Sequence, residues 1–228
     1  MTQRSLAKLR TRQRLLAAAK QLVADRGYEA ATLRDVAALA EMSTGAVFAN
    51  FADKADLFNE VIVDDLAELL DEMTRAASAA ATARDAVLAM LTAGYALHAE
   101  RLSLVQAQMG FSWSCGRPLQ QRRGAPVARI RAALANALQA GVASGELATS
   151  MDAELIAEMA WDSYEAGYRH AIFEGWGLAN LRAYAETRID VLLDGYRPAA
   201  RPVVSPSIAA RDPRARPLNA ERQTALLG

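Results

Sequence analysis

The sequence has very few of the side chains that cross-link a chain or hold a metal ion. Its 228 residues include one cysteine, Cys115, and two histidines. A disulfide within the chain is therefore excluded, and no cysteine or histidine pattern has the spacing of a zinc site. We expect no metal and no cofactor, and a single thiol suits the reducing interior of a cell.

Long apolar runs are also missing. No segment approaches the roughly 20 consecutive apolar residues that a membrane-spanning helix needs. The N-terminus has no continuous apolar stretch of the kind found in secretory signals. The sequence predicts a cytoplasmic protein that does not enter the membrane.

Side chains that favour strands are scarce. Aromatic residues make up 6% of the chain, and Ala and Leu are the dominant apolar residues. Because Ala and Leu favour helices, whereas β-branched and aromatic residues favour strands, the composition predicts an all-α fold. With 52% hydrophobic residues, the chain can bury one large core, or a small domain joined to a larger one.

Common enzyme signatures are absent as well. The chain contains no G-x-S-x-G motif, no glycine-rich phosphate loop after a strand, and no histidine near Cys115 in the sequence. We therefore predict that the protein is not an enzyme, and we name no catalytic residue.

The formal net charge is zero, but the charges are unevenly spread. Six basic residues precede the first acidic one: Arg4, Lys8, Arg10, Arg12, Arg14 and Lys20. An arm that lies near nucleic-acid phosphates needs such a segment, although a solvated helix face would look the same.

Helix signals divide the first part of the chain into short elements. Apolar residues at helical spacing predict a helix over 5–26, which Gly27 would end. Three further helices have caps at Thr32, Ser43 and Asp53, and Asp35 gives the first of them a weak capping box. The helices after Thr32 and Ser43 are short, ending near residues 40 and 49.

Longer helical patterns follow, over 83–97, 99–113, 119–143, 152–173 and 178–196. Beyond residue 196 the chain holds five of its seven prolines and no aromatic residue. Such a composition does not build a packed core, so we predict that 197–228 is a basic, mostly disordered tail.

Two short helices joined by a tight turn, the second beginning at a serine, are typical of a helix-turn-helix. The apolar underside is predicted to consist of Val36, Ala37, Ala40, Val47 and Phe51. The side chains predicted to face outward are those of Thr44, Ala46, Ala49 and Asn50. Small and polar residues on that face suit a helix that lies close to the bases of a major groove.

The stretch TLRDVAALAEMSTGAVFANFADKADLF, from Thr32 to Phe58, resembles the DNA-binding signature of the TetR family of transcriptional regulators. The positions in register are Thr32, the Asp35-Val36-Ala37 step, Ala40, Ser43, Gly45, Phe48, Phe51 and Lys54. The resemblance implies a DNA-binding domain over 1–52 and a helical ligand-binding and dimerisation domain over 53–196, in which 53–78 is a linking helix.

The resemblance also implies a set of DNA-contact residues: Arg34, Ser43, Thr44, Gly45, Phe48, Asn50 and Lys54. Ser43 and Lys54 would hold phosphates, and Thr44 would meet base edges. Asn50 would read an adenine or hold a phosphate, and Gly45 would let the backbone approach DNA or a neighbouring helix. Simpler roles stay open: Ser43 as a cap, Asn50 as a helix terminator and Lys54 as a solvated charge.

Two positions depart from the family pattern. Phe48 stands where the family usually has a tyrosine, so the hydroxyl contact to a phosphate is lost or replaced by packing. Glu41 stands at the turn where glycine is usual, and a left-handed conformation there costs a non-glycine residue on the order of 1 kcal/mol. A carboxylate is unfavourable beside phosphates, so we expect Glu41 to point away from the DNA.

The tight connection EGWGL, residues 174–178, predicts that the last two long helices form an antiparallel pair. Two such pairs could form the four-helix interface of a homodimer. The predicted seam consists of Ile156, Met159, Ser163, Gly167, Leu181, Ala185, Arg188 and Leu192. The alternative is that this pair completes the core of a single chain.

Large apolar and a few polar side chains in the middle of the chain predict a ligand pocket. Its candidate residues are His98, Met109, Phe111, Trp113, Trp161, Tyr164 and Tyr168, each of which could instead belong to the core. The sequence thus predicts a dimeric repressor of a palindromic double-stranded DNA operator, released by an apolar or aromatic small molecule. The alternative is a helical interaction or scaffold protein without sequence-specific DNA binding.

Overall fold

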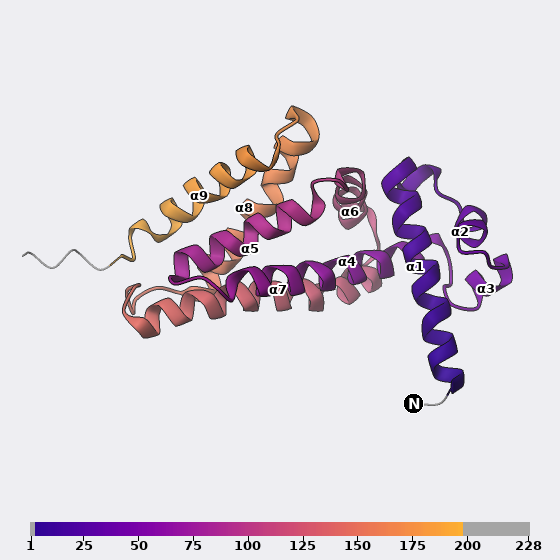
Figure 1. Ribbon diagram of the computed structural model, residues 1–228, viewed down its shortest axis with the longest axis horizontal. Coiled ribbons are helices and arrows are strands. Elements are labelled where there is room, and N and C mark those ends of the chain that lie inside the picture. Colours follow the sequence, from indigo (N-terminus) through magenta and orange to yellow (C-terminus); the bar gives the residue numbers. More distant parts are fainter. Residues whose placement is uncertain (1–2, 198–228) are drawn as a thin grey trace, which may run out of the picture. The chain divides into compact units, whose positions relative to one another are not determined.

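The computed structural model describes residues 3–197, and every regular element within them is a helix (Figure 1). In chain order the helices are α1 (Gln3–Ala30), α2 (Leu33–Leu39), α3 (Thr44–Phe48), α4 (Lys54–Ala77), α5 (Ala83–His98), α6 (Leu102–Ser114), α7 (Arg117–Ser144), α8 (Ala153–Glu174) and α9 (Leu178–Asp194). The predicted all-α fold is confirmed. Within the described residues, no helix has the length and apolar character needed to cross a membrane.

The predicted caps form as side-chain hydrogen bonds. Thr32 Oγ1 accepts from the Asp35 N–H at 3.2 Å, and an Asp35 carboxylate oxygen accepts from the Thr32 N–H at the same distance. Ser43 Oγ accepts from the Ala46 N–H at 3.2 Å and caps α3, and Asp53 Oδ1 accepts from the Asp56 N–H at 2.7 Å and caps α4. The predicted helix starts are therefore confirmed, because short side-chain acceptors satisfy donors that lack a partner in the first turn.

Gly27 interrupts α1 and ends its first helix, as predicted from the sequence. Its φ of 78° and ψ of 165° place a kink there, and the helical residues after it extend to Ala30. The predicted end of the first helix at residue 26 is therefore confirmed, and the residues from the kink to Ala30 form a separate short helical segment. Glycine adopts this backbone conformation readily because it lacks a Cβ.

Helix α4 connects the first three helices to the rest of the described residues. It packs against α1, α5 and α7, and Figure 1 shows it running from beside α1 along α7 and α5. Apolar residues at helical spacing, including Phe58, Ile62 and Leu69, are buried along its length. One continuous apolar core consequently extends from Leu15 in α1 to Leu193 in α9.

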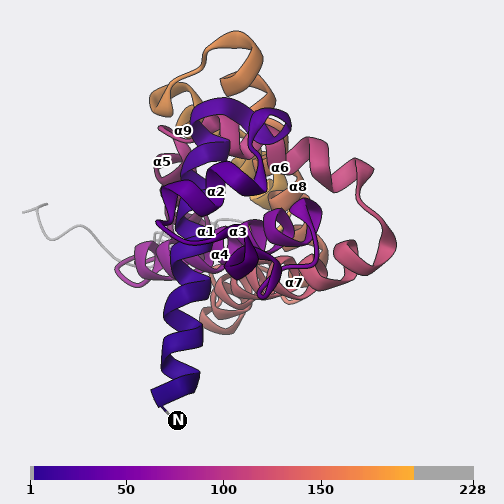
Figure 2. The same ribbon diagram turned by 90° about the vertical axis from the view of Figure 1, so that its right-hand side faces the viewer.

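Helices α5, α7, α8 and α9 pack on one another around that core, and α6 contacts both α1 and α8. Figure 1 shows α2 and α3 at one end of the described residues, and Figure 2, which faces that end, shows them in front beside α1. The division at residues 52 and 53 remains a prediction. Apart from Arg197, the predicted tail lies outside the described residues.

Candidate DNA-binding module and ligand cavity

A tight turn joins α2 to α3 and closes the end of α2. The Met42 N–H donates to the Ala37 carbonyl at 2.9 Å, and the Glu41 N–H donates to the Ala38 carbonyl at 3.0 Å. Glu41, at the corner, has a φ of 54°, in the left-handed region. This pair of hydrogen bonds is the helix ending that glycine usually completes. The Glu41 side chain is 87% exposed and lies 3.7 Å from Arg14.

The two helices bury the side predicted from the sequence. None of the five underside residues, Val36, Ala37, Ala40, Val47 and Phe51, is more than 5% exposed. Gly45 and Phe48, three residues apart on α3, share an exposed side of that helix, and Phe48 is 57% exposed. Arg34 is exposed on α2. The module thus has a packed underside and an accessible α3.

Two of the predicted DNA-contact side chains already have partners within the chain. Asn50 Nδ2 donates to the Ala46 carbonyl at 2.8 Å, while its Oδ1 is shielded from solvent without a hydrogen bond. Lys54 Nζ donates to the Glu29 carbonyl at 3.0 Å and lies 4.3 Å from the centre of the Tyr28 ring. Either side chain would have to change conformation to reach DNA, so both roles stay predictions.

The remaining predicted contacts are more accessible. Ser43 is exposed and uses its hydroxyl as the α3 cap, and Thr44 is half-buried in the first turn. A capping hydroxyl still has a donor and a lone pair to offer. Contact of Ser43, Thr44, Gly45, Phe48 and Arg34 with DNA remains a prediction.

Several basic residues of α1 hold the module together instead of extending into solvent. Arg12 pairs with Glu60 of α4 and lies over the Phe51 ring at 4.6 Å. Arg14 donates to the Ala40 carbonyl at 2.6 Å. Lys8 and Arg10 are exposed. The basic segment therefore combines structural cations with exposed ones, a distinction that charge counting does not make.

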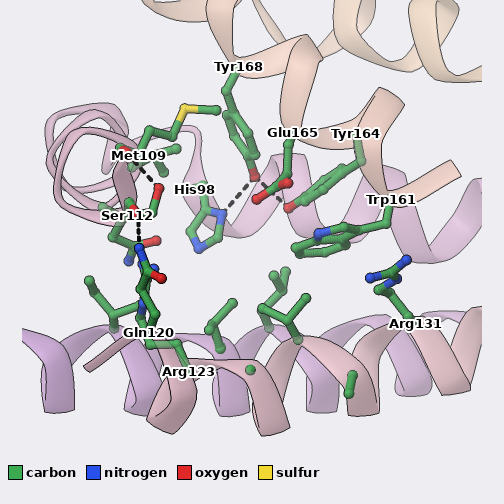
Figure 3. A pocket seen from close by; sticks show the side chains of 18 residues that line it. His98, Met109, Ser112, Gln120, Arg123, Arg131, Trp161, Tyr164, Glu165 and Tyr168 are labelled. Carbon is green, nitrogen blue, oxygen red and sulfur yellow. Dashed lines mark hydrogen bonds between the residues drawn. The ribbon is translucent and has the colours of Figure 1, made fainter. Parts of the chain in front are cut away.

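A cavity of about 320 Å³ lies between α4, α5, α6, α7 and α8 (Figure 3). Its apolar wall includes Ile62, Leu66, Leu69, Val105, Met109, Val127 and Trp161. Its polar lining includes His98, Gln108, Ser112, Gln120, Arg123, Arg131, Tyr164, Glu165 and Tyr168. Apolar walls with a few polar groups are typical of small-molecule sites, and the volume is at the lower end of their range.

Five of the seven predicted pocket residues line this cavity: His98, Met109, Trp161, Tyr164 and Tyr168. Phe111 and Trp113 do not, and this part of the prediction is corrected. Phe111 faces the other way on α6, where its ring lies 5.6 Å from Tyr28 and 5.2 Å from Phe58. Trp113 is 90% exposed. Successive residues of a helix point in different directions, so neighbours in the sequence cannot all face one cavity.

Behind the cavity, buried polar groups form a continuous network. His98 Nε2 donates to Asp65 at 2.9 Å, and the Tyr168 hydroxyl lies 2.7 Å from His98 Nδ1. The Tyr164 and Tyr168 hydroxyls are hydrogen-bonded to each other. Lys20, from α1, lies 2.8 Å from the other oxygen of Asp65. The network thus reaches from the cavity wall to the first helix.

Nearby positive charges together have a larger effect than burial on the pKa of Asp65, the carboxylate in this network. Burial acts to raise the pKa of Asp65, but His98 and Lys20 outweigh it and hold that pKa well below its ordinary value. Burial raises the pKa of Tyr164 and of Tyr168 well above the usual range, so both hydroxyls stay neutral. Asp65 therefore remains an anion inside the core, compensated by its partners.

Sequence reasoning did not find Asp65, Arg123 or Glu165. Asp65 lies on the buried face of α4. A charged residue among apolar ones at helical spacing is the sequence pattern that could have identified it as a buried, functional candidate. Arg123 and Glu165 look like ordinary surface charges of long helices, and the fold brings them to one cavity.

The predicted dimer seam does not form a single exposed face. Ile156, Gly167, Leu181 and Ala185 are buried within this chain, and Met159 is 43% exposed. Ser163, Arg188 and Leu192 are half-buried. These four buried residues belong to the core of the single chain, so the prediction that they contact a second copy is corrected.

A different set of large apolar side chains is exposed on the last two helices: Leu155, Met159 and Phe173 on α8, and Leu178 and Val191 on α9. Eighteen residues separate Leu155 from Phe173, which is five turns at about 3.6 residues per turn, so both lie on one side of α8. Phe173 and Val191 are each 73% exposed.

Comparison with known proteins agrees with this architecture. Residues 15–61 match the family model of bacterial regulatory proteins of the tetR family, which confirms the resemblance of the helix-turn-helix segment. A search of curated proteins finds no significant match. The chain also shares its fold with solved structures of low sequence identity.

Two of these structures cover nearly all of their own chains. A TetR-family transcriptional regulator from Mesorhizobium loti aligns with a TM-score of 0.70 and 21% identity, over 87% of this chain and 100% of that one. FadR from Bacillus subtilis, in complex with stearoyl-CoA, aligns with a TM-score of 0.69 and 18% identity, over 80% and 98%. At such identities the likeness establishes the fold alone.

Proposed function

Because the helix-turn-helix segment, residues 15–61, belongs to the TetR family of bacterial regulatory proteins, we propose that the protein represses transcription from a palindromic operator as a homodimer and is released by a small molecule. The observation that carries the proposal is the combination of a packed helix-turn-helix, whose α3 is accessible, with a mostly apolar cavity in the body. The helix-turn-helix would recognise the operator, and the cavity would bind the small molecule.

The accessible side of α3 supports the DNA-binding part. Small residues there, Gly45 and Ala49, allow close approach to a groove, and the exposed Phe48 ring offers apolar contact in place of a hydroxyl. Exposed cations at Lys8, Arg10 and Arg34 add sequence-independent attraction to phosphates. In this proposal the cations position the module on the DNA backbone, and α3 recognises the base sequence.

The exposed apolar residues of α8 and α9 support the dimer. A single helix-turn-helix makes few contacts, and two of them matched to a palindrome give the affinity that a regulator needs. Phe173 and Val191 would lie in water unless a second copy covers them.

The cavity and the module share two connections that could carry a ligand signal. Helix α6 lines the cavity with Val105 and Met109, and its Phe111 packs on Tyr28 and Phe58 near the module. Lys20 of α1 joins the polar network that ends at Tyr168 in the cavity wall. A ligand that displaces α6 or the tyrosines would change how α1 is held. FadR of B. subtilis, which has the same fold, holds stearoyl-CoA.

DNA selection followed by a salt titration tests the proposal. Fragments bound from genomic DNA of the source organism would define the operator, and fluorescence anisotropy would measure its affinity across salt concentrations. We expect log affinity to fall linearly with log salt, and Arg34→Gln to reduce that slope by about one. Gln at the exposed Arg129 of α7 is the control and should leave the slope unchanged. No binding to any DNA at low salt would favour the scaffold alternative.

A further inference from the structure

Arg123, on the α7 side of the cavity, forms no ion pair among the described residues, although its charge acts on Glu165 nearby. Its Nε is shielded from solvent and donates no hydrogen bond, and no carboxylate of the described chain lies within ion-pair distance. Arg131, the other arginine of the lining, is paired with Glu158. A shielded guanidinium donor without an acceptor is costly, because a guanidinium cannot lose its proton.

Glu165, from α8, is the carboxylate that lines the same cavity (Figure 3). Burial, together with the nearby charge of Asp162, raises its pKa above the ordinary value, whereas Arg123 and Arg131 act in the opposite direction. The Glu165 side chain is exposed to solvent at the open side of the cavity. Unlike Arg123, the Glu165 carboxylate becomes neutral when it binds a proton, and it can then donate a hydrogen bond.

The two charges are therefore not equivalent as ligand anchors. The charge of Arg123 persists at every physiological pH, while that of Glu165 can be neutralised. An anion bound at Arg123 would satisfy the orphaned donor and gain a charge-assisted hydrogen bond. A cation bound at Glu165 would be repelled by Arg123, whose charge already acts on Glu165.

We infer that the cavity binds a small organic acid, whose carboxylate is held by Arg123 and whose apolar body packs against the wall formed by α4, α6 and Trp161. This inference rests on the proposed function, because it names the class of molecule that would act as the signal. The apolar wall includes Leu66, Leu69, Val105 and Met109, which favour a hydrocarbon or aromatic body. The cavity volume of about 320 Å³ limits the ligand to modest size.

Matched probes that differ only in the head group test the inference. Decanoate, 1-decanol and decylamine share one body, and 1-naphthoate, 1-naphthol and 1-naphthylmethylamine share another. Isothermal titration without DNA should show at least one acid binding about tenfold or more tightly than its alcohol and its amine, as a charge-assisted hydrogen bond predicts. Arg123→Gln should remove this preference. The variant should fold normally, because the Nε of Arg123 donates no hydrogen bond and Arg123 forms no ion pair among the described residues.

Two control variants make the result specific. Arg129→Gln makes the same change on α7 at a residue that does not line the cavity, and it should leave the preference intact. Glu165→Gln mimics the neutral carboxyl group and should preserve or strengthen acid binding. Tightest binding of the amine that is lost in Glu165→Gln would overturn the inference, as would equal affinity for acid and alcohol or no binding of either acid.

The titration also separates this inference from the proposed function. It measures the ligand without DNA, whereas operator affinity is measured separately. A protein that binds its operator but shows no acid preference would disprove the ligand class and leave the regulator intact. A protein that binds the acid but no DNA would support the ligand class and disprove the proposed regulator.

Discussion

Lys20 Nζ lies 2.8 Å from Oδ1 of Asp65, so an ion pair joins the first helix to a carboxylate buried in α4. The other oxygen of Asp65 accepts from His98 at 2.9 Å and from Gln108 at 2.8 Å. Tyr168 continues the chain of contacts from His98 to the cavity. The pair therefore lies where the first helix meets the polar network behind the cavity.

Replacing Lys20 by methionine tests how much this ion pair contributes to the free energy of unfolding. Methionine keeps an apolar stem but leaves Asp65 with a weaker set of partners, and breaking a buried pair from one side is strongly destabilising. Because His98 and Gln108 remain, we expect Lys20→Met to lower the free energy of unfolding by about 2–4 kcal/mol. Urea denaturation would measure the loss. Lys8→Met, at an exposed site of α1, should change stability by less than about 0.5 kcal/mol.

The same variant tests whether the pair carries the ligand signal. We expect Lys20→Met to bind a cavity ligand with unchanged affinity but to show a smaller effect of that ligand on operator affinity, since the polar connection to α1 is gone. Anisotropy titrations with and without ligand give this ratio. A full ligand response in the variant would mean that the coupling passes through other contacts, of which Phe111 against Tyr28 and Phe58 is the candidate.

Glu41→Gly should stabilise the module. Glu41 has a φ of 54°, and glycine adopts this conformation without the steric penalty of a Cβ. Its ion pair with Arg14 is 3.7 Å long with a highly exposed carboxylate, so losing it costs little. We expect a net gain of about 0.5–1 kcal/mol, because the greater freedom of glycine in the unfolded chain offsets part of the relief.

Glu41→Ala is the matched control for that gain. It removes the same carboxylate but keeps the Cβ, so the backbone penalty remains and no stabilisation is expected. Thermal unfolding of the three proteins separates the backbone effect from the charge effect. Equal stabilisation by alanine and glycine would show that the carboxylate, and not the backbone, was unfavourable.

The features that were predictable from the sequence are those that depend on neighbours in the chain. The caps at Thr32, Ser43 and Asp53 need partners only three residues away, so their residue types identify them. The buried side of α2 and α3 follows from helical spacing alone. The fold class and the helix-turn-helix are therefore predictable from the sequence alone.

The features that sequence reasoning missed depend on which helices meet. Phe111 and Met109 are two residues apart, yet one packs on Tyr28 and the other lines the cavity, and this division follows from the placement of α6 between α1 and α8. Ile156 and Leu181 match an interface pattern as well as a core pattern, because both patterns are apolar stripes. The same limit applied to Arg123, whose missing partner is a property of the assembled cavity.

Gly167→Ala should be destabilising although alanine normally favours a helix. A Cβ at this position would overlap the Tyr95 hydroxyl and lie 2.9 Å from its Cζ. Tyr95 is buried, and its hydroxyl donates to the Tyr164 carbonyl at 3.0 Å, so it cannot move aside freely. Overpacking of this kind costs about 1–3 kcal/mol.

A control and a second variant isolate the clash. Gly110→Ala, where the added Cβ meets open space on α6, should raise stability by up to about 1 kcal/mol from helix propensity. Tyr95→Phe removes the overlapping hydroxyl, so Gly167→Ala should cost less in that background. Urea denaturation of the double-mutant cycle gives the coupling energy, and additive effects would argue against the contact.

The ion pair between Arg84 of α5 and Asp190 of α9 should make a small, pH-dependent contribution to stability. Two nitrogens of Arg84 donate to Asp190 at 2.7 and 2.8 Å. These bonds, with help from Arg197, lower the pKa of Asp190 to about 2 from 3.8. Because the folded pKa lies below the unfolded one, the contribution is fully present above about pH 4 and is lost as pH falls toward 2.

Asp190→Asn measures this contribution. The carboxylate is 40% exposed, so solvent screening limits the loss at pH 7 to about 1 kcal/mol or less. Urea denaturation at several pH values should show the difference from the wild type narrowing below pH 4. Asp194→Asn, at an exposed site of the same helix, should not show this narrowing.

Phe173 and Val191 test where two copies of the protein would meet. Each is 73% exposed in the single chain, and exposed side chains of this size stabilise an assembly when a partner removes them from water. We expect the wild type to sediment as a dimer at micromolar concentration and Phe173→Ser with Val191→Ser to sediment as a monomer. Trp113→Ser, which removes a 90% exposed ring from α6, should leave the dimer intact. A dimer that persists in the double variant would place the interface elsewhere, and a monomeric wild type would contradict the homodimer itself.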